Sequence, residues 1–360
     1  MDKLASEAVD LLKEMIAIPS PSFSEDAVCT HICRWMEGRA IPYTRKGNNI
    51  ICRNQKKLEK PMLMLCAHID TVSPSEGYDF DPYVPDYSKA AEILGLNTGF
   101  VAGLGSNDDG GSVVSMISTF RHFLAKGEDA PNLMLVLTCE EERSGKGGMT
   151  TLWDELKEEV DMAIVGEPTG MRAATSERGL LVIDAEAEGV SGHAARNEGV
   201  NALYIALEDI AAIREHKFEK ISPKMGKVNV NVTQINAGCA HNVVPDSCTF
   251  VIDIRPTEQY TNEEIFNELQ SICRSRLTPR NLSNRSSATC EDSRLSATAE
   301  ELGIGTFSSP TTSDWMRISC DAVKMGPGES ERSHKKDEYV LVSEIAEGIR
   351  TYIEFINNIK

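Results

Sequence analysis

The first half of the chain contains three short runs of consecutive apolar residues, at Met62–Ala67, Leu133–Thr138 and Met162–Val165. Continuous apolar runs of this length are typical of strands buried on both faces of a parallel sheet. Between the first two runs, Gly111–Ala125 has the apolar spacing of a helix. Because buried strands alternate with a helix, the pattern predicts an α/β domain with a doubly wound sheet.

The pattern of apolar residues changes near residue 175. Five further segments follow, which read in order as a strand, a helix, two strands and a helix: Leu180–Ala187, Ala202–Ile213, Val228–Val232, Thr249–Ile254 and Asn262–Arg276. The first two of these strands alternate between apolar and polar positions, as expected when one face of a sheet is exposed. This order predicts most of a ferredoxin-like α+β unit, whose final strand has no clear pattern.

The α/β character returns after the polar stretch Asn281–Ser287, which we interpret as a linker. Ala322–Met325 predicts another strand, and Ser343–Ile359 has the spacing of an amphipathic helix. The sequence therefore predicts one domain formed by residues 1–174 and 286–360, interrupted by an inserted domain at residues 175–285. No internal repeat is visible.

Charge restricts the classes of partner. The chain has 55 acidic residues against 37 Lys and Arg, a formal net charge of −18. Binding to phosphate groups needs a basic surface, so this balance argues against nucleic acid and acidic membrane surfaces as partners.

The sequence also indicates the cellular compartment in which the protein is expected. Residues 1–18 have the spacing of an amphipathic helix interrupted by acids, unlike a signal peptide. No segment approaches the roughly 18 consecutive apolar residues of a membrane span. The ten cysteines are scattered, and some, such as Cys66 and Cys248, lie inside apolar runs. We therefore expect buried, reduced thiols in a cytoplasmic protein.

Acidic residues follow each of the three buried runs. His68-Ile69-Asp70 follows the first, Glu140-Glu141-Glu142 the second, and Gly166-Glu167-Pro168 the third. Ligand sites in open α/β sheets lie at the carboxyl ends of the strands, so these segments should converge in one crevice. Grouped carboxylates repel one another, and a divalent metal ion would offset that repulsion.

Other residues can reach this crevice. Asp70 is placed to hold the imidazole of His68, since residues two apart on a strand leave on the same side. The glycine-rich segment before Gly111 lacks the pattern of a nucleotide loop, and it could turn sharply to present Asp108 to a cation. We expect its neighbour Asp109 to be the N-cap of the following helix. His334 follows the strand predicted at Ala322–Met325.

Five motifs occur here in the order found in a known family: His68-Ile69-Asp70, Asp108, Thr138–Glu142, Gly166–Thr169, and Ser333-His334 through Glu338. The chain resembles acetylornithine deacetylase, succinyl-diaminopimelate desuccinylase and related co-catalytic zinc peptidases over nearly its whole length. The likeness is closest to the acetylornithine deacetylase branch. It implies a catalytic metal-binding domain and an inserted lid and dimerisation domain.

The resemblance implies a site for two divalent metal ions, zinc with cobalt as an alternative. Asp108 would bridge the metals, His68 and Glu167 would complete one site, and Glu142 and His334 the other. Glu141 would be the general base that activates water, and Asp70 would orient His68. A register shifted by one residue would instead make Glu140 the base and Glu141 the ligand.

The inserted domain also carries residues that match the family. His193, in Ser191–Arg196, resembles the histidine that stabilises the oxyanion, often in the partner subunit's site, which implies a homodimer. Asn242 resembles a substrate-contacting residue, and Arg255 the residue that binds the substrate α-carboxylate. A salt bridge to Asp253 or Glu258 is the alternative role of Arg255.

The resemblance implies hydrolysis of the amide bond of an N-acyl amino acid. The substrate would be N-acetylornithine, or N-acetyl- or N-succinyl-citrulline, in arginine biosynthesis. The alternatives are succinyl-diaminopimelate desuccinylation and dipeptide or carboxypeptidase cleavage, and, more remotely, a non-catalytic amino-acid- or metal-binding protein. Lys335 and Lys336 replace the small or apolar residues usual after the last histidine, and Asp109 replaces a neutral residue. These departures could alter the charge preferred in the substrate.

Overall fold

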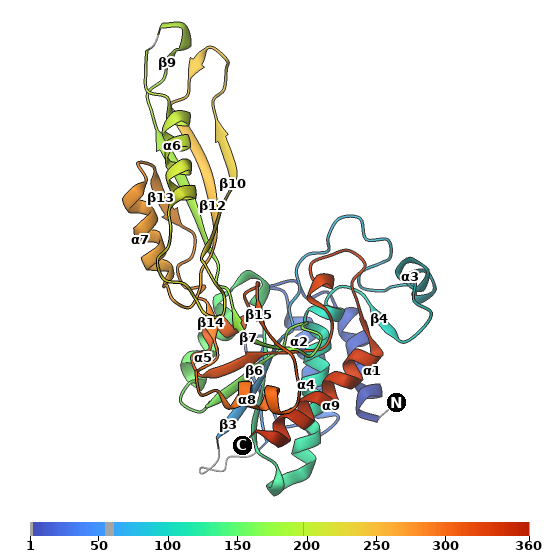
Figure 1. Cartoon of the computed structure of the whole chain (residues 1–360). Coiled ribbons are helices and arrows are strands. Elements are labelled where there is room, and N and C mark those ends of the chain that lie inside the picture. The colour runs from blue at the N-terminus through green and yellow to red at the C-terminus, as the bar shows by residue number, and fades with distance from the viewer. Residues whose placement is uncertain (1–2, 55–60, 197, 360) are drawn as a thin grey trace. The chain divides into compact units, whose positions relative to one another are not determined.

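The structure is a computed structural model that describes residues 3–54, 61–196 and 198–359 (Figure 1). The chain divides into two compact units. Unit 1 consists of Met1–Thr175, Ala288–Phe307 and Ser313–Lys360, and unit 2 of Ser176–Ser287 and Ser308–Thr312. Unit 2 thus takes in a short second segment, residues 308–312, that lies outside the expected insertion at residues 175–285.

Unit 1 contains most of the helices and strands. In chain order they are α1 Lys3–Ile16, α2 Asp26–Glu37, β1 Thr44–Lys46, β2 Asn49–Arg53, β3 Met62–His68, α3 Tyr87–Leu94, β4 Phe100–Ala102, α4 Gly111–Lys126, β5 Asn132–Thr138, α5 Thr151–Leu156, β6 Met162–Val165, β7 Ala173–Glu177, β14 Ser287–Ala288, α8 Arg294–Glu301, β15 Thr306–Ser309, β16 Asp321–Lys324, β17 Tyr339–Leu341 and α9 Val342–Asn358. The strands β7, β14 and β15 extend by one or two residues into unit 2.

The main sheet has the strand order β1-β2-β5-β3-β6-β16-β7-β14, with β15 paired to β7. β3 pairs in parallel with both β5 and β6, and β16 pairs in parallel with β6. The prediction that the three apolar runs form buried parallel strands is therefore confirmed. β1, β2 and β7 pair in antiparallel fashion, so the sheet as a whole is mixed.

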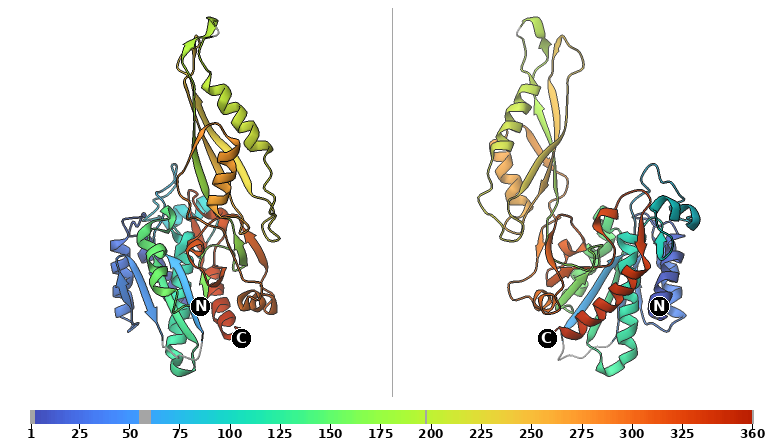
Figure 2. Two further views of the ribbon diagram at one scale, coloured as in Figure 1. Left: turned by 90° about the vertical axis from the view of Figure 1, so that its left-hand side faces the viewer. Right: turned by 45° about the vertical axis from the view of Figure 1, so that its right-hand side comes forward.

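Both faces of this sheet are covered, which explains why its central strands β3, β5 and β6 are buried at every position and mostly apolar. The core on one face is formed with α1, α2, α4 and α9, and the core on the other with α5 and the turn at residues 314–317 (Figure 2). The predicted helices at residues 111–125 and 343–359 correspond to α4 and α9. Tyr352 of α9 is fully buried and donates a hydrogen bond to the carbonyl of Met325.

The first helix, α1, buries the apolar side that its spacing predicts, including Leu11 and Leu12. Met1 and Asp2, with which the predicted helix begins, lie outside the described residues. Among the helices that the structure describes, none combines the length and the apolar character needed to cross a membrane.

Unit 2 is a four-stranded antiparallel sheet with two helices on one face (Figure 2). Its elements are β8 Leu181–Glu188, β9 Gly192–His193, α6 Ala202–Glu215, β10 Asn229–Ala237, β11 Val243–Val244, β12 Ser247–Arg255, α7 Asn262–Ile272 and β13 Arg276–Pro279. The sheet order is β10-β12-β8-β13, and β9 and β11 form a separate ribbon. The elements of the sheet and its helices follow the β-α-β-β-α-β order of a ferredoxin-like fold.

The final strand of unit 2, β13, has no clear pattern in the sequence because it is only four residues long and includes Pro279. Only Leu277 of this strand is buried in the core. The preceding helix α7 ends at Ile272, four residues before the predicted end at Arg276. The residues between the helix and the strand form the tight connection that the sequence pattern merged with the helix.

The cysteines differ in part from the expectation of buried thiols. None of the ten forms a disulfide within the described part of the chain, and six are buried. Cys239 and Cys290 are exposed, and Cys273 and Cys320 are partly exposed. The expectation was wrong for these four because they lie outside the apolar runs, in connecting segments or at element ends.

Candidate metal centre

The segments that follow the three parallel strands meet at one edge of the unit 1 sheet. His68 is the last residue of β3, Glu141 and Glu142 follow β5, and Glu167 follows β6. Parallel pairing of β3 with both neighbours places these ends side by side. The expected convergence of these acids is therefore observed in the structure, where Glu141, Glu142 and Glu167 each lie in a close group with His68.

His68 is held by Asp70 and faces Asp108. Its Nδ1 lies 3.0 Å from the backbone carbonyl of Asp70 and 3.5 Å from the Asp70 carboxylate. Its Nε2 lies 3.2 Å from Oδ1 of Asp108. A proton on Nδ1 would be held by Asp70, which leaves Nε2 directed into the cluster. The carbonyl of Asp70 is the nearer partner, so both its backbone and its side chain orient the ring.

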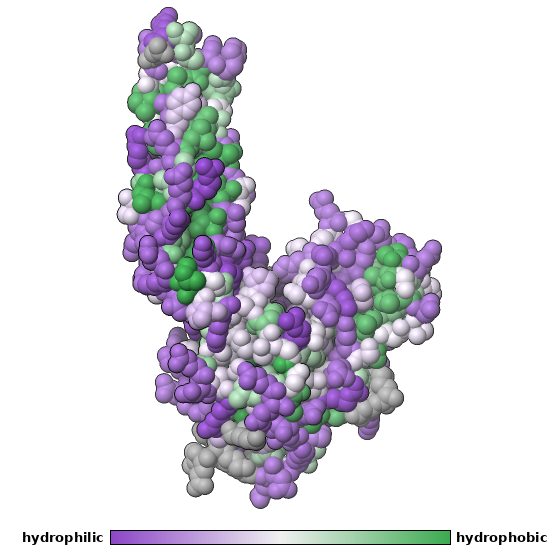
Figure 3. All heavy atoms as spheres, in the orientation of Figure 1, coloured by the Kyte–Doolittle hydropathy of each residue, from purple (hydrophilic) through white to green (hydrophobic). Residues whose placement is uncertain are grey.

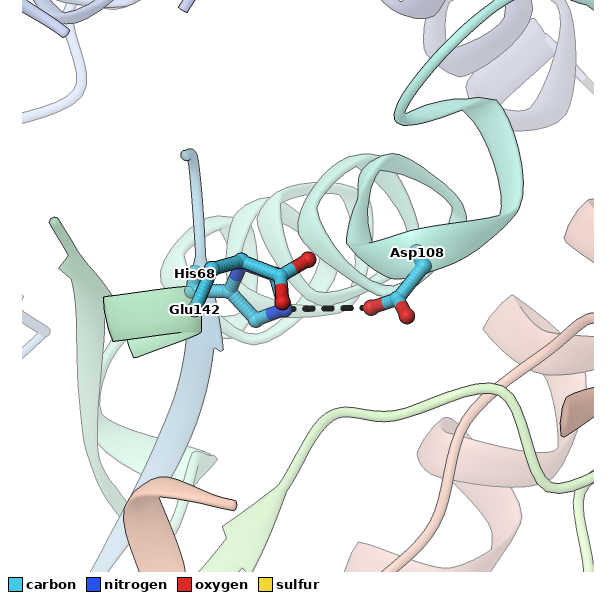
Figure 4. Close-up of side chains that lie close together, drawn as sticks. All are labelled: His68, Asp108 and Glu142. Carbon is cyan, nitrogen blue, oxygen red and sulfur yellow. Dashed lines mark hydrogen bonds and ion pairs between the residues drawn. The ribbon is translucent and has the colours of Figure 1, made fainter. Parts of the chain in front are cut away.

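Asp108 presents its two carboxylate oxygens to different histidines. Oδ1 faces Nε2 of His68 at 3.2 Å, and Oδ2 lies 3.6 Å from Nε2 of His334. Glu142 adds a further oxygen, at 2.9 Å from Nε2 of His334. Figure 4 shows His68, Asp108 and Glu142 pointing toward one another from three separate elements. A carboxylate between two imidazoles has the geometry of a bridging ligand.

The acidic segment after β5 forms a short 3-10 turn, Glu141–Arg143. Asp70 explains the turn, because its two oxygens accept the backbone N–H groups of Glu141 and Glu142 at 3.0 and 3.2 Å. Glu140 does not join the cluster. Its carboxylate accepts the N–H of Gly147 at 2.8 Å, and this geometry favours Glu141 and Glu142 over the shifted register.

Two sets of side chains are grouped closely enough to hold a metal ion. The ligand atoms of His68, Asp108 and Glu142 lie within 4.8 Å of one another, and so do those of His68, Glu141 and Glu167. The second group contains Glu141, the predicted base, beside the predicted ligand Glu167. The His68 side chain is only 2% exposed, whereas that of His334 is 56% exposed, so the cluster opens to solvent at His334.

The cluster contains more carboxylate side chains than side chains that can carry a positive charge. Burial raises the pKa of Glu141 and of Glu167 well above the usual carboxyl range, and other carboxylates act in the same direction. Burial also raises the pKa of Glu142. For His68, burial lowers the pKa, but its contacts with Asp108 and Asp70 outweigh burial and raise it. The hydrogen bond to Glu142 raises the pKa of His334 to about 9.

This excess of buried carboxylates fits a site for divalent metal ions. Imidazole nitrogens and carboxylate oxygens are ligands that zinc accepts, and cobalt uses the same donors. Ligation would offset the repulsion between buried carboxylates that otherwise favours their protonation. The donor set and its charge therefore suit the metals that the sequence motifs imply.

Asp109 is not the helix cap that the sequence suggested. The helix α4 begins at Gly111 after Gly110, and no side chain caps it. Asp109 is buried and lies beside Ser112 and the backbone of His68. A Cβ added at Gly166 would lie 3.1 Å from Oδ2 of Asp109, so this carboxyl points toward the end of β6. Burial raises the pKa of Asp109 to about 8.

Two residues near the N-terminus support the cluster and were not identified from the sequence. The hydroxyl of Ser22 donates to Asp70 at 2.6 Å, and the buried carboxylate of Glu25 accepts the N–H of Glu140 at 3.1 Å. Both lie in an irregular segment between α1 and α2, where no periodic pattern marks them. Only their contacts distinguish them from other polar loop residues.

The remaining candidates lie in unit 2. His193 and the segment of Asn242 are adjacent, because β9 pairs with β11 and the N–H of Ala194 donates to the Asn242 carbonyl at 3.1 Å. The His193 ring is exposed, and its Nδ1 accepts the N–H of Ala195 at 3.2 Å. Arg255 makes a paired salt bridge to Asp253 at 2.9 and 3.1 Å, which is the alternative role expected for it.

Curated proteins with several activities are similar to this chain. A probable carboxypeptidase of Emericella nidulans is 27% identical over 70% of this chain and 63% of its own length. An acetylornithine deacetylase of Myxococcus xanthus is 31% identical over 59% of this chain and 61% of its own length. A succinyl-diaminopimelate desuccinylase of Bordetella parapertussis is 26% identical over 99% and 98%. The match therefore spans only about three fifths of the first two relatives' length.

Solved structures share the fold along nearly the whole chain. Aminopeptidase PepT of Bacillus cereus has a TM-score of 0.77 at 18% identity and covers 99% of this chain, with 98% of its own chain covered. A dinuclear metal-binding peptidase of Bacillus subtilis has a TM-score of 0.74 at 15% identity, with the same coverage. Residues 64–358 match the model of peptidase family M20/M25/M40. Taken with the clustered motifs, this match shows that the chain belongs to peptidase family M20/M25/M40.

Proposed function

We propose that this protein hydrolyses the amide bond of an N-acyl amino acid and uses two divalent metal ions, zinc or alternatively cobalt. The observation that carries the proposal is the position of Asp108, whose two oxygens face His68 and His334 separately. A carboxylate that only stabilised the fold would need to face only one of these histidines. In this proposal, His68 and Glu167 serve one ion, Glu142 and His334 serve the other, and Asp108 serves both.

Glu141 is the proposed general base. When bound, two divalent ions polarise the amide carbonyl and lower the pKa of a water molecule toward neutrality. A carboxylate oxygen of Glu141 accepts the proton of that water and then delivers it to the nitrogen of the leaving amine. The burial that raises the pKa of Glu141 suits this role, because a base of higher pKa is a better proton acceptor.

Residues of unit 2 are proposed to bind the substrate. His193 would donate a hydrogen bond to the oxyanion, and Asn242 would contact the substrate. Arg255 would bind the α-carboxylate, for which it would exchange its present partner Asp253. The family resemblance supports these roles, and unchanged turnover in a His193→Ala variant would remove the first of them.

The proposed substrates are N-acetylornithine and N-acetyl- or N-succinyl-citrulline, as intermediates of arginine biosynthesis. The similarity to the acetylornithine deacetylase of Myxococcus xanthus supports this choice. The alternatives are desuccinylation of succinyl-diaminopimelate and peptide cleavage, which correspond to the other named relatives.

A substrate panel tests this proposal. Purified protein loaded with Zn²⁺ should contain about two ions per chain and release free amino acid from at least one N-acyl ornithine or citrulline. Succinyl-diaminopimelate and dipeptides belong in the same panel. If fully loaded protein hydrolyses neither N-acyl ornithine nor N-acyl citrulline, the first choice of substrate is excluded, whereas cleavage of dipeptides would establish the alternative.

We also propose that the protein is a homodimer formed through unit 2. Tyr204 and Leu207 are 64% and 49% exposed and lie on one side of α6, and Ile235 is 48% exposed on the edge strand β10. Figure 3 shows apolar side chains reaching the surface along this unit. An unpaired edge strand beside exposed apolar residues favours association with a second copy.

Sedimentation should detect this dimer. The double variant Tyr204→Asp and Leu207→Asp should sediment as a monomer, because charge would be buried at the interface. The matched control is Val84→Asp, which changes an apolar residue of unit 1 that is 71% exposed. If the wild-type protein sediments as a monomer at micromolar concentration, the dimer is excluded.

A further inference from the structure

Two loops that are more than 200 residues apart in the sequence meet beside the metal centre. We call residues 103–110 the Asp108 loop and residues 326–338 the His334 loop. The Asp108 loop follows β4 and the His334 loop precedes β17, and these two strands pair with each other. Each loop therefore has one end anchored in the same two-stranded ribbon. The proposed metal ligand of each loop, Asp108 or His334, lies in irregular chain.

One carboxylate of the His334 loop accepts three N–H groups of the Asp108 loop. Oε1 of Glu338 accepts the N–H groups of Asn107 and Asp108 at 2.8 and 2.9 Å, and Oε2 accepts that of Gly105 at 3.1 Å. Glu338 is only 2% exposed. Its side chain thus holds the backbone of the residue whose carboxylate faces both histidines.

A side chain of the Asp108 loop, that of Asn107, in turn forms hydrogen bonds with the His334 loop. The amide of Asn107 donates to the carbonyl of Glu329 at 3.1 Å and to the hydroxyl of Ser333 at 3.4 Å, and its oxygen accepts the N–H of Glu329 at 2.9 Å. A Cβ at Gly328 would lie 2.3 Å from this oxygen, so a glycine is needed for the close approach. Ser333 immediately precedes His334 in the sequence.

These contacts matter because two of the proposed metal ligands lie in loops and not in a strand or helix. His68 ends a strand in the centre of the sheet, whereas Asp108 and His334 both lie in irregular loops. Outer-shell partners typically hold metal ligands to within the tolerance that binding needs, and their removal lowers metal affinity about 10- to 100-fold. Among the described residues, the reciprocal contacts of Glu338 and Asn107 join these two loops directly.

We propose that Glu338 and Asn107 are positioning residues that set the separation of Asp108 and His334, and so determine how tightly the ion shared by Asp108, Glu142 and His334 is held. The inference rests on the proposed two-ion function. It assigns to these residues no contact with substrate or with the reacting atoms. Their effect is on the metal ligands alone.

A Glu338→Gln variant tests the proposal without reference to turnover. The amide replaces one acceptor oxygen by an N–H donor, which must face a backbone N–H of the Asp108 loop. Chelator-treated protein would be titrated with Co²⁺, followed by calorimetry and by visible absorption. We expect the Kd of one of the two ions to rise about 10- to 100-fold, with a changed absorption spectrum for that ion and a smaller change for the other.

A matched control is available in unit 2. Asp209 is a buried carboxylate that accepts the N–H groups of Arg274 and Ser275 and the hydroxyl of Ser275, at 3.0, 2.7 and 2.5 Å. The Asp209→Asn variant removes a comparable set of hydrogen bonds and should lower the melting temperature without altering either Co²⁺ affinity. The Asn107→Ala variant leaves Glu338 in place and should show the same weakened binding of one Co²⁺ ion. If Glu338→Gln does not fold, the Asn107→Ala variant tests the inference in its place.

The outcomes are distinguishable. Unchanged affinity for both ions in folded Glu338→Gln and Asn107→Ala would overturn the inference and leave the proposed function intact. An equal loss in Asp209→Asn would also overturn it, because the effect would then reflect general stability. If wild-type protein itself binds fewer than two ions, the proposed function fails and the inference fails with it.

Discussion

Replacing Asp108 with alanine should reduce the number of tightly bound divalent ions from two to at most one and abolish hydrolysis. Asp108 is the only side chain of the described cluster with one oxygen directed to each histidine. Its loss also leaves the imidazoles without the carboxylate between them. Metal ions stabilise the charge that develops in the transition state by several kcal/mol, and about 1.4 kcal/mol corresponds to a tenfold change in rate. We therefore expect the turnover rate to fall by about a thousandfold or more.

Metal analysis after dialysis, together with turnover of the best substrate, measures this effect. The neighbouring Asp109 offers a matched control, since it is also a buried aspartate but belongs to neither ligand group. The Asp109→Asn variant should retain two ions. The bridging role of Asp108 would be refuted by an Asp108→Ala protein that still binds two ions with wild-type affinity.

Replacing Glu141 with glutamine should lower kcat by about 10²- to 10⁴-fold while both ions remain bound. The amide has nearly the same shape as the carboxylate but cannot accept the proton of water. Burial and neighbouring carboxylates raise the pKa of Glu141, in the direction expected of a general base. Steady-state kinetics on metal-loaded protein provide the measurement.

The adjacent Glu140 distinguishes the two registers of the acidic segment. Its carboxylate is bonded to the N–H of Gly147, outside the cluster, so Glu140→Gln should keep nearly wild-type turnover. If Glu140→Gln is the inactive variant instead, the shifted register is correct. If Glu141→Gln loses an ion, Glu141 acts as a ligand, as its grouping with His68 and Glu167 would allow.

Much of the framework of the site was predictable from local patterns. Continuous apolar runs predicted β3, β5 and β6, and their parallel pairing placed His68, the acidic segment and Glu167 at one edge. This inference succeeds because burial on both faces leaves an unmistakable run of apolar residues. Parallel strands then align their carboxyl ends, whatever the connecting segments do.

Other features depended on contacts that leave no local pattern. Asp109 had the sequence position of a helix cap, yet it is buried near Gly166. The turn at Glu141 and Glu142 forms because Asp70, some 70 residues earlier, binds both N–H groups. Supporting residues such as Glu25 lie in irregular chain, where polar residues look alike.

The sequence alone determined the α/β class, the two-part organisation of the pattern and the acidic segments that follow the parallel strands, because apolar periodicity and residue chemistry are local properties. Tertiary structure decided how Asp108 divides its oxygens between His68 and His334, and that Glu141 and Glu142, not Glu140, lie beside these histidines. It also brought Glu338 against the backbone of Asp108. Such arrangements depend on distances between segments far apart in the chain, which no local pattern encodes.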